Sequence, residues 1–141
     1  MKVFARAYLC GWDTRPEEMK RRLLLINPGS MVQAARAGTV KNEFLVEMLA
    51  AQTLQAEASG SLLAKKPEID FLLRLAGTTQ ISRAIREHGA REGSPFILVV
   101  AGHSEQKGLA ELEGMELPRR TLAASELGRV ERAALLNAQR S

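Results

Sequence analysis

The chain has 141 residues, close to the usual size of one domain, so we expect a single domain over residues 1–141. Hydrophobic residues make up 45% of the sequence and charged residues 26%, which excludes a disordered or collagen-like chain. Lys and Arg number 20 against 16 Asp and Glu, and the net charge of +4 suits a partner that carries phosphates without requiring one.

Cysteine content and hydropathy indicate the compartment. Cys10 is the single cysteine, so an intrachain disulfide is impossible and a reducing environment fits. No apolar run approaches the roughly 20 residues that span a bilayer, and the N-terminus lacks the basic-then-apolar pattern of a signal peptide. We therefore expect a soluble, cytoplasmic protein without membrane contact.

The first elements are predicted to be strands around one short helix. Residues Lys2 to Leu9 alternate with the period of a strand that has one face more buried. A short helix follows, capped by Asp13 or Thr14, and Leu23 to Ile26 reads as a buried strand. The turn residues Asn27-Pro28-Gly29 end this strand.

The next region is predicted to be helical. Ser30 is expected to cap a short helical turn that Gly38 closes. A longer helix begins at Thr39 or Asn42 and ends near Ser59-Gly60, because apolar side chains recur along one stripe between these points.

The centre of the chain predicts a strand, a turn and a helix. Glu68 to Ala76 alternates as a strand does, and Gly77 breaks the pattern. Thr78 or Thr79 can cap the helix that follows, which Gly89 terminates.

The last third contains one clear strand and one clear helix. Phe96 to Ala101 is fully apolar, as in a buried strand. We expect a helix from Ser104 through Leu112 and a short edge segment from Met115 to Leu117, and Ser125 to Ala138 reads as an amphipathic helix. The elements together favour an α+β fold, a two-layer sandwich in which a small mixed or antiparallel sheet packs with helices.

The sequence offers little material for catalysis. Its two histidines, His88 and His103, lie outside any metal-ligand spacing, and we find no Walker loop or nucleophile elbow. An enzyme acting on a phosphorylated ligand would also need a general base, for which there is no candidate. We expect a protein that is not an enzyme and that has no metal and no cofactor.

The helix start after Thr79 is the strongest candidate site, because free backbone amides and the helix dipole can hold an anion there. Three polar side chains add donors, one arginine lies a turn further on, another points from the preceding strand, and two lysines lie in the loop before it. The candidate residues for binding phosphates are Lys65, Lys66, Arg74, Thr78, Thr79, Gln80 and Arg83.

A simpler interpretation stays open. In this interpretation the two threonines only cap the helix, Arg74 only pairs with Asp70, and the lysines only solubilise a loop. Aromatic side chains that could stack on bases are scarce, with Trp12 and Tyr8 as the candidates besides phenylalanine.

The segment Asp70 to Ile85, with the sequence DFLLRLAGTTQISRAI and followed by Gly89-Ala90, resembles the central segment of the PRPK-binding-protein family, in its archaeal form. This family is a small subunit of KEOPS, the complex that makes threonylcarbamoyladenosine in tRNA. The likeness extends to Ile26-Asn27 and to the run from Val130 to Leu136.

The resemblance implies an α+β subunit without catalysis of its own or a small-molecule substrate. It would dock on the kinase-like ATPase subunit of KEOPS and bind the single-stranded CCA end of tRNA. Arg74 and Gln80 would be polar RNA contacts, while Ile81, Ala84 and Ile85 would be core. Thr79 departs from the basic residue expected in some relatives.

Two points stay open beside this resemblance. The docking surface would be the exposed sides of the helices that begin at Asn42 and Gln80. The alternative function is a pure protein-interaction module that activates the kinase without touching RNA.

Overall fold

The computed structural model describes residues 2–11 and 13–140. Strands and helices alternate irregularly along this part of the chain. In order they are β1 (Phe4–Cys10), α1 (Pro16–Ile26), β2 (Met31–Arg36), α2 (Glu43–Ala58), α3 (Pro67–Ala76), α4 (Ile81–His88), β3 (Phe96–Gly102), the 3₁₀ turn η1 (Ala110–Leu112) and α5 (Ala124–Arg140).

The three strands form one antiparallel sheet in the order β1-β3-β2. The apolar strand β3 takes the central position, and all seven of its residues are buried. Its register places Gly102 opposite Phe4 of β1, and Ala101 opposite Met31 of β2. A central strand covered on both faces needs apolar residues throughout, which explains why β3 lacks the alternation seen in β1.

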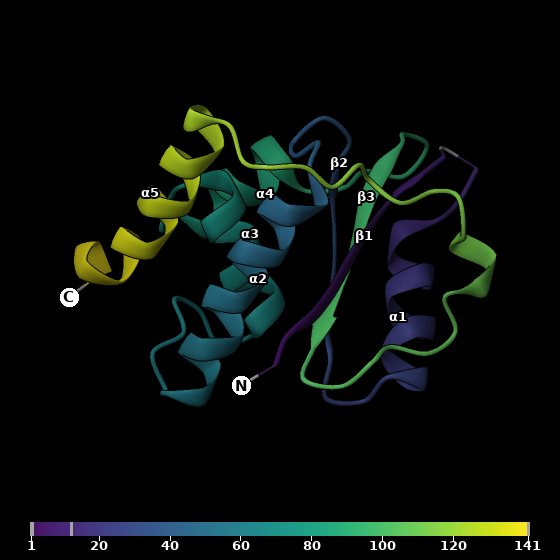
Figure 1. Ribbon diagram of the computed structural model, residues 1–141, viewed down its shortest axis with the longest axis horizontal. Helices are drawn as coiled ribbons and strands as arrows, with labels where there is room; N and C mark the ends of the chain where they lie inside the picture. The colour runs from purple at the N-terminus through teal and green to yellow at the C-terminus, as the bar shows by residue number, and fades with distance from the viewer. Residues whose placement is uncertain (1, 12, 141) are drawn as a thin grey trace.

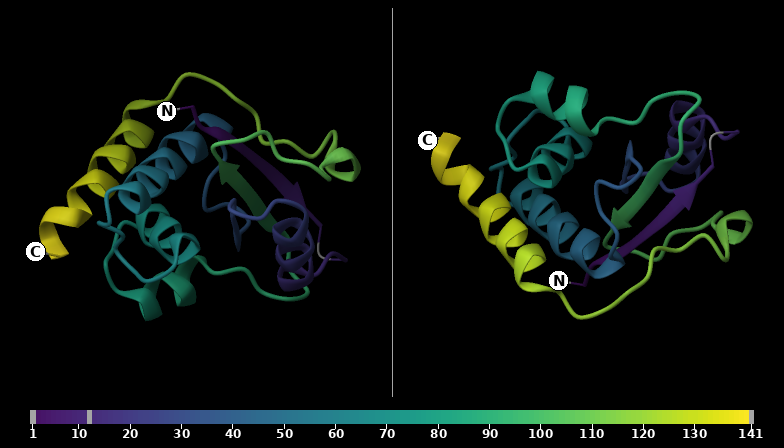
Figure 2. Two further views of the ribbon diagram at one scale, coloured as in Figure 1. Left: turned by 90° about the horizontal axis from the view of Figure 1, so that it is seen from below. Right: turned by 90° about the horizontal axis from the view of Figure 1, so that it is seen from above.

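Helices α2 to α5 form a layer on one face of the sheet, and α1 covers the other face (Figure 1). Both views in Figure 2 show α5 beside α2 on the side of the sheet away from α1. The larger core cluster joins the sheet to Leu45, Leu49 and Phe71 of the helical layer, and a smaller cluster joins it to Met19 and Leu23 of α1. The predicted α+β class, with a small antiparallel sheet packed against helices, is confirmed. Among the described residues, no helix has the length and apolar character needed to cross a membrane.

The predicted strand from Glu68 to Ala76 is wrong, because this segment is helix α3. Pro67 occupies its first turn, where a missing N–H costs nothing, and Gly77 ends it in the left-handed conformation with φ +71°. Residues 70–75 are all buried. A helix surrounded on all sides carries apolar residues all round, so its sequence can alternate by coincidence.

Two predictions in the first third are also wrong. Leu23 to Ile26 is the last part of α1, whose N-cap is Arg15 without a side-chain capping bond, so neither Asp13 nor Thr14 caps it. The segment after Ser30 is strand β2 and not a helical turn.

Most other predictions are confirmed. The strands near Lys2 to Leu9 and Phe96 to Ala101 are β1 and β3, and α2, α4 and α5 lie close to their predicted bounds. Met115 to Leu117 is an edge segment, since Leu9 N–H donates to the Met115 carbonyl at 2.8 Å and Leu117 N–H to the Ala7 carbonyl at 2.9 Å. The helix expected from Ser104 is reduced to η1.

Candidate nucleic-acid interface

The turn from Gly77 to Gln80 joins α3 to α4. The amides of Gly77 and Thr78 both donate to the Leu73 carbonyl, at 2.8 and 3.2 Å, which closes the C-terminus of α3. The Thr78 hydroxyl accepts a hydrogen bond from Gln80 N–H at 3.1 Å. Gln80 is the N-cap residue of α4, and no side chain caps this helix, so the prediction that Thr78 or Thr79 caps it is wrong. The first amides of α4 are therefore placed to receive an anion.

Helix α4 exposes the apolar side chains that the sequence assigned to the core. Only Ala84 is buried, at 1% exposure, whereas Ile81 is 44% exposed and Ile85 is 49% exposed. Ala84 lies in the core cluster and α4 packs against α3, and the two isoleucines lie on the flanks of Ala84, where this contact meets the solvent. Because they are four residues apart, they form one apolar strip beside the turn.

Helix α5 brings two arginines to the same corner. The side chain of Arg132 lies over Gly77, with its Cδ 3.0 Å from the position that a Cβ on Gly77 would occupy. Arg129 donates to the Leu75 carbonyl at 3.0 Å and to the Thr39 carbonyl at 2.9 Å. Neither arginine was predicted to lie at this site. Their spacing of three residues on one helix was visible, but nothing in the sequence says that this helix packs on α3.

Arg83 lies on the exposed surface of α4 and forms an ion pair with Glu87 at 2.8 Å. The hydrogen bond from Arg83 lowers the pKa of the Glu87 carboxyl. An exposed pair of this kind contributes little to stability, so Arg83 can exchange its carboxylate for a phosphate.

Arg74 does not lie at this surface. It is 2% exposed, and its guanidinium pairs with both carboxylate oxygens of Asp70, at 2.7 and 3.1 Å. It also donates to the Ala133 carbonyl and to Asn137 Oδ1. On a helix, positions four apart share a face, so the two charges meet inside the core. The prediction that Arg74 contacts RNA is wrong, and the simpler interpretation of this residue is the one that the structure shows.

The predicted lysines lie apart from the other candidates. Lys65 and Lys66 are exposed and precede α3, whereas Thr78, Thr79 and Gln80 follow it. A helix of this length separates them by about 15 Å at 1.5 Å per residue. The structure therefore joins Thr78, Thr79, Gln80 and Arg83 at one corner and leaves the lysines out. Of the aromatic candidates, Tyr8 is buried, and Trp12 lies outside the described residues.

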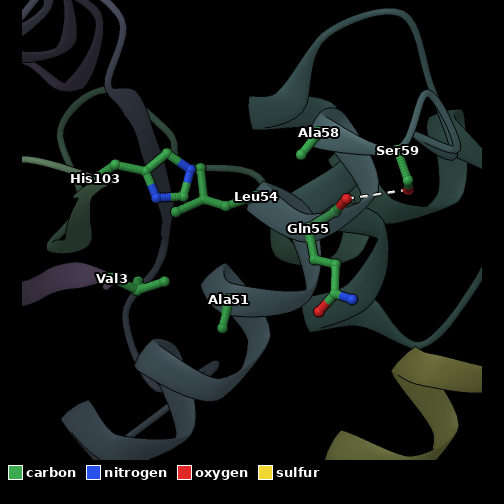
Figure 3. A pocket seen from close by; sticks show the side chains of 7 residues that line it. All are labelled: Val3, Ala51, Leu54, Gln55, Ala58, Ser59 and His103. Atoms are coloured by element: carbon green, nitrogen blue, oxygen red, sulfur yellow. Dashed lines mark hydrogen bonds between the residues drawn. The ribbon is translucent and has the colours of Figure 1, made fainter. Parts of the chain in front are cut away.

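The structure also contains a hollow of about 510 Å³ on another part of the surface. It lies between the start of β1, the second half of α2 and His103, and Figure 3 shows the side chains that face it. Its lining residues are Val3, Ala51, Leu54, Gln55, Ala58, Ser59 and His103. With small and apolar side chains and no Lys or Arg in its lining, this hollow does not suit a phosphate.

In comparisons with known proteins, no family model and no curated protein matches the chain. Within residues 2–11 and 13–140, no three His, Cys, Asp or Glu side chains are grouped so that they could hold a metal ion.

Proposed function

We propose that this chain is a non-catalytic subunit of the KEOPS tRNA-modifying complex, in which it binds the single-stranded CCA end of tRNA and docks on and regulates the kinase-like ATPase subunit. The observation that carries the RNA part is the exposure of Ile81 and Ile85 beside Arg83 and Arg132. The resemblance of Asp70 to Ile85 to the PRPK-binding-protein family supports it.

The chemistry of the corner fits an unpaired RNA end. Bases outside a duplex expose flat apolar faces, and proteins usually bind them through aromatic or other apolar side chains. Ile81 and Ile85 can take that part here, since aromatic residues make up only 4% of the sequence. Arg83, Arg132 and the amides at the start of α4 can hold phosphates. A base-paired end would keep its bases stacked and could not use the isoleucines.

A second surface supports docking on a protein partner. Leu24, Leu25 and Ile26 are exposed at the end of α1, with Leu25 at 73%. Neighbouring exposed apolar side chains often mark an interaction site. Helix α1 lies across the sheet from α4 and α5, so RNA and a partner could bind at the same time (Figure 1). The same exposure also supports the alternative of a pure interaction module, in which Ile81 and Ile85 would contact protein.

The RNA part is tested by anisotropy with labelled tRNA that ends in CCA and with the same tRNA lacking CCA. Ile81→Glu combined with Ile85→Glu should weaken binding of the CCA-ended tRNA at least about tenfold, because the apolar surface under the bases is lost and two carboxylates are placed beside the phosphates. Leu25→Glu is the matched control and should leave RNA affinity unchanged. Equal affinity of the wild-type protein for both tRNAs would refute binding of the CCA end.

The phosphate contacts are tested by the salt dependence of the same binding. Each phosphate contact to single-stranded RNA contributes about 0.7 to the slope of log affinity against log salt. Arg83→Glu combined with Arg132→Glu should therefore lower the slope by about 1.4. Arg21→Glu on α1 is the control. Absence of binding even at low salt would favour the interaction module, and Leu25→Glu would then be examined for loss of binding to the kinase-like subunit.

A further inference from the structure

A cluster of positive charge lies at the C-terminal end of α4, where the proposed function assigns no role. It consists of Arg36 at the end of β2, His88 at the end of α4, and Arg129 on α5. The distance along α4 from Ile81 to His88 is about 10 Å at 1.5 Å per residue. The cluster therefore lies within reach of an RNA strand that already contacts the isoleucines.

Backbone contacts fix the three elements relative to one another. Ala35 of β2 forms a bridge with Gly89, directly after α4. Arg36 donates from one terminal nitrogen to the Arg86 carbonyl at 2.8 Å. Arg129 is anchored to the carbonyls of Leu75 and Thr39, and Thr39 N–H in turn donates to the Arg36 carbonyl at 3.2 Å. The side chains of Arg36 and Arg129 are thus held in place before any ligand binds.

Two carboxylates act on the cluster, Glu87 on His88 and Glu126 on Arg129, but each forms its ion pair with an arginine outside the cluster, Arg83 and Arg120 respectively. Within the described part of the chain, neither Arg36 nor Arg129 belongs to an ion pair, although Arg83 pairs with Glu87. Arg36 Nε is buried and has no hydrogen-bond partner. A partly buried cation without a counter-charge is costly, so an anion from outside the chain placed beside Arg36 would stabilise it.

The surroundings of His88 agree with this picture. Burial lowers the pKa of the His88 imidazole, and the positive charges of Arg129, Arg36 and Arg83 lower it further, while Glu87 opposes them. Arg86 completes the charged groups near it on α4. On α3, Asp70 and Arg74 are paired with each other inside the core. An anion placed between the imidazole and the arginines would reverse the balance and favour the protonated ring.

We propose that Arg36, His88 and Arg129 form a subsite for one phosphate group of the bound RNA strand. Arg36 and Arg129 supply fixed positive charge, and His88 takes up a proton as the phosphate binds. The identity of the ligand as RNA rests on the proposed function, whereas the subsite itself requires only a phosphate. One consequence is that RNA affinity rises as the pH falls, by up to about tenfold per pH unit, the limit for uptake of one proton.

The chain has two histidines, so NMR of the imidazole Hε1 protons tests the subsite directly. The pKa of each histidine is measured in the free protein, with inorganic pyrophosphate, and with an RNA oligonucleotide ending in CCA. The pKa of His88 should rise with both ligands, and that of His103, which lies at the hollow beside β1, should not change. Arg36→Gln should abolish the rise, and Arg21→Gln should not.

The outcomes separate the subsite from the proposed function. If RNA binds by anisotropy while the pKa of His88 stays constant, the subsite is refuted and the proposed function stands. If RNA does not bind but pyrophosphate raises the pKa of His88, the subsite stands as a site for a free phosphate compound and the proposed function fails. If neither ligand changes His88, the subsite is refuted. RNA affinity should depend on pH in the wild-type protein and should not depend on pH in His88→Gln. This result supports the subsite without relying on Arg36 variants.

Discussion

Replacement of Arg74 by methionine would remove the charge that compensates a buried carboxylate. Asp70 accepts hydrogen bonds from the Thr53 hydroxyl at 2.6 Å and from Leu63 N–H at 2.9 Å, in addition to its two bonds from Arg74. Arg74 also bonds to the Ala133 carbonyl of α5. The pair therefore connects α3 to α2, to α5 and to the loop between α2 and α3. Arg74→Met keeps much of the side-chain volume but leaves Asp70 without a counter-charge.

The expected cost follows from the burial of the pair. Removal of one partner of a buried ion pair typically costs about 3–5 kcal/mol, because the remaining charge stays desolvated. With Asp70 at 0% exposure and Arg74 at 2%, we expect about 4 kcal/mol in the free energy of unfolding. For a domain of this size, 1 kcal/mol corresponds to about 4 °C, so Tm should fall by about 15 °C.

The assay is urea unfolding followed by circular dichroism, with Arg83→Met as the matched control. Arg83 and Glu87 are also spaced four apart on a helix, but this pair is exposed, so its loss should barely move the unfolding midpoint. RNA affinity should show the opposite order: Arg83→Met weakens binding, and Arg74→Met does not when measured on folded protein. If Arg74→Met is as stable as the wild-type protein but binds RNA more weakly, Arg74 is an RNA contact and not a buried ion-pair partner, and this prediction is refuted.

Three further predictions concern other parts of the structure. Gly77→Ala should destabilise the protein by about 1–2 kcal/mol in urea unfolding, because alanine is strained at φ +71° and its Cβ would press against Arg132. Gly128→Ala in α5 is the matched control: its Cβ would meet open space, so it should stabilise the protein by about 0.5–1 kcal/mol. Burial raises the pKa of the Cys10 thiol to about 11, so a thiol reagent in mildly alkaline buffer should react only as fast as the protein unfolds; rapid labelling of native protein would contradict this. The pKa of His88 is lowered in the folded state, so the unfolded chain binds more protons at mildly acidic pH. The free energy of unfolding should therefore fall as the pH drops below about 6.5, and it should fall less in the variant His88→Gln.

Most element bounds could be predicted from the sequence, including those of the fully buried strand β3, but helix α3 and strand β2 could not. Strand β1 and helix α5 lie close to their predicted bounds, although apolar side chains such as Leu9 and Leu135 are exposed on them. Helix α3 contacts α2, α4, α5 and β2, and its polar pair Asp70–Arg74 is buried with the apolar residues, so no exposed polar face reveals its period. Pro67 and Gly77 were the signals that could have decided for a helix, since proline starts helices and glycine ends them.

Strand β2 was missed for a different reason. It contains Gln33, a polar residue that is buried in the structure. Its amide donates to the Glu68 carbonyl at 2.8 Å and its carbonyl accepts from Ala34 N–H at 2.9 Å. The first of these partners lies on α3, so the burial of Gln33 depends on tertiary contacts that no local pattern records.

The candidate site also contains residues that could be predicted from the sequence and residues that could not. The turn from Thr78 to Gln80 and the neighbouring Arg83 were found, because a helix start and its first turn are local features. The position of Arg74 in the core, and those of Arg129 and Arg132 at the corner, depend on the packing of α5 against α3. Which arginines are available to a ligand is therefore a property of the tertiary structure.

Helix α4 has few of the features that stabilise a helix. It has eight residues, buries only Ala84 and has no side-chain cap, and isolated helices of this length are marginal in water. Exposure of Ile81 and Ile85 also forgoes the stabilisation that their burial would give. The helix is held by its contacts with α3 and by the attachment of its C-terminal end to β2 through Arg36 and Gly89. Departures of this kind are expected where a surface serves binding, and the apolar strip, the uncapped amides and the arginine cluster all lie on or beside this one helix.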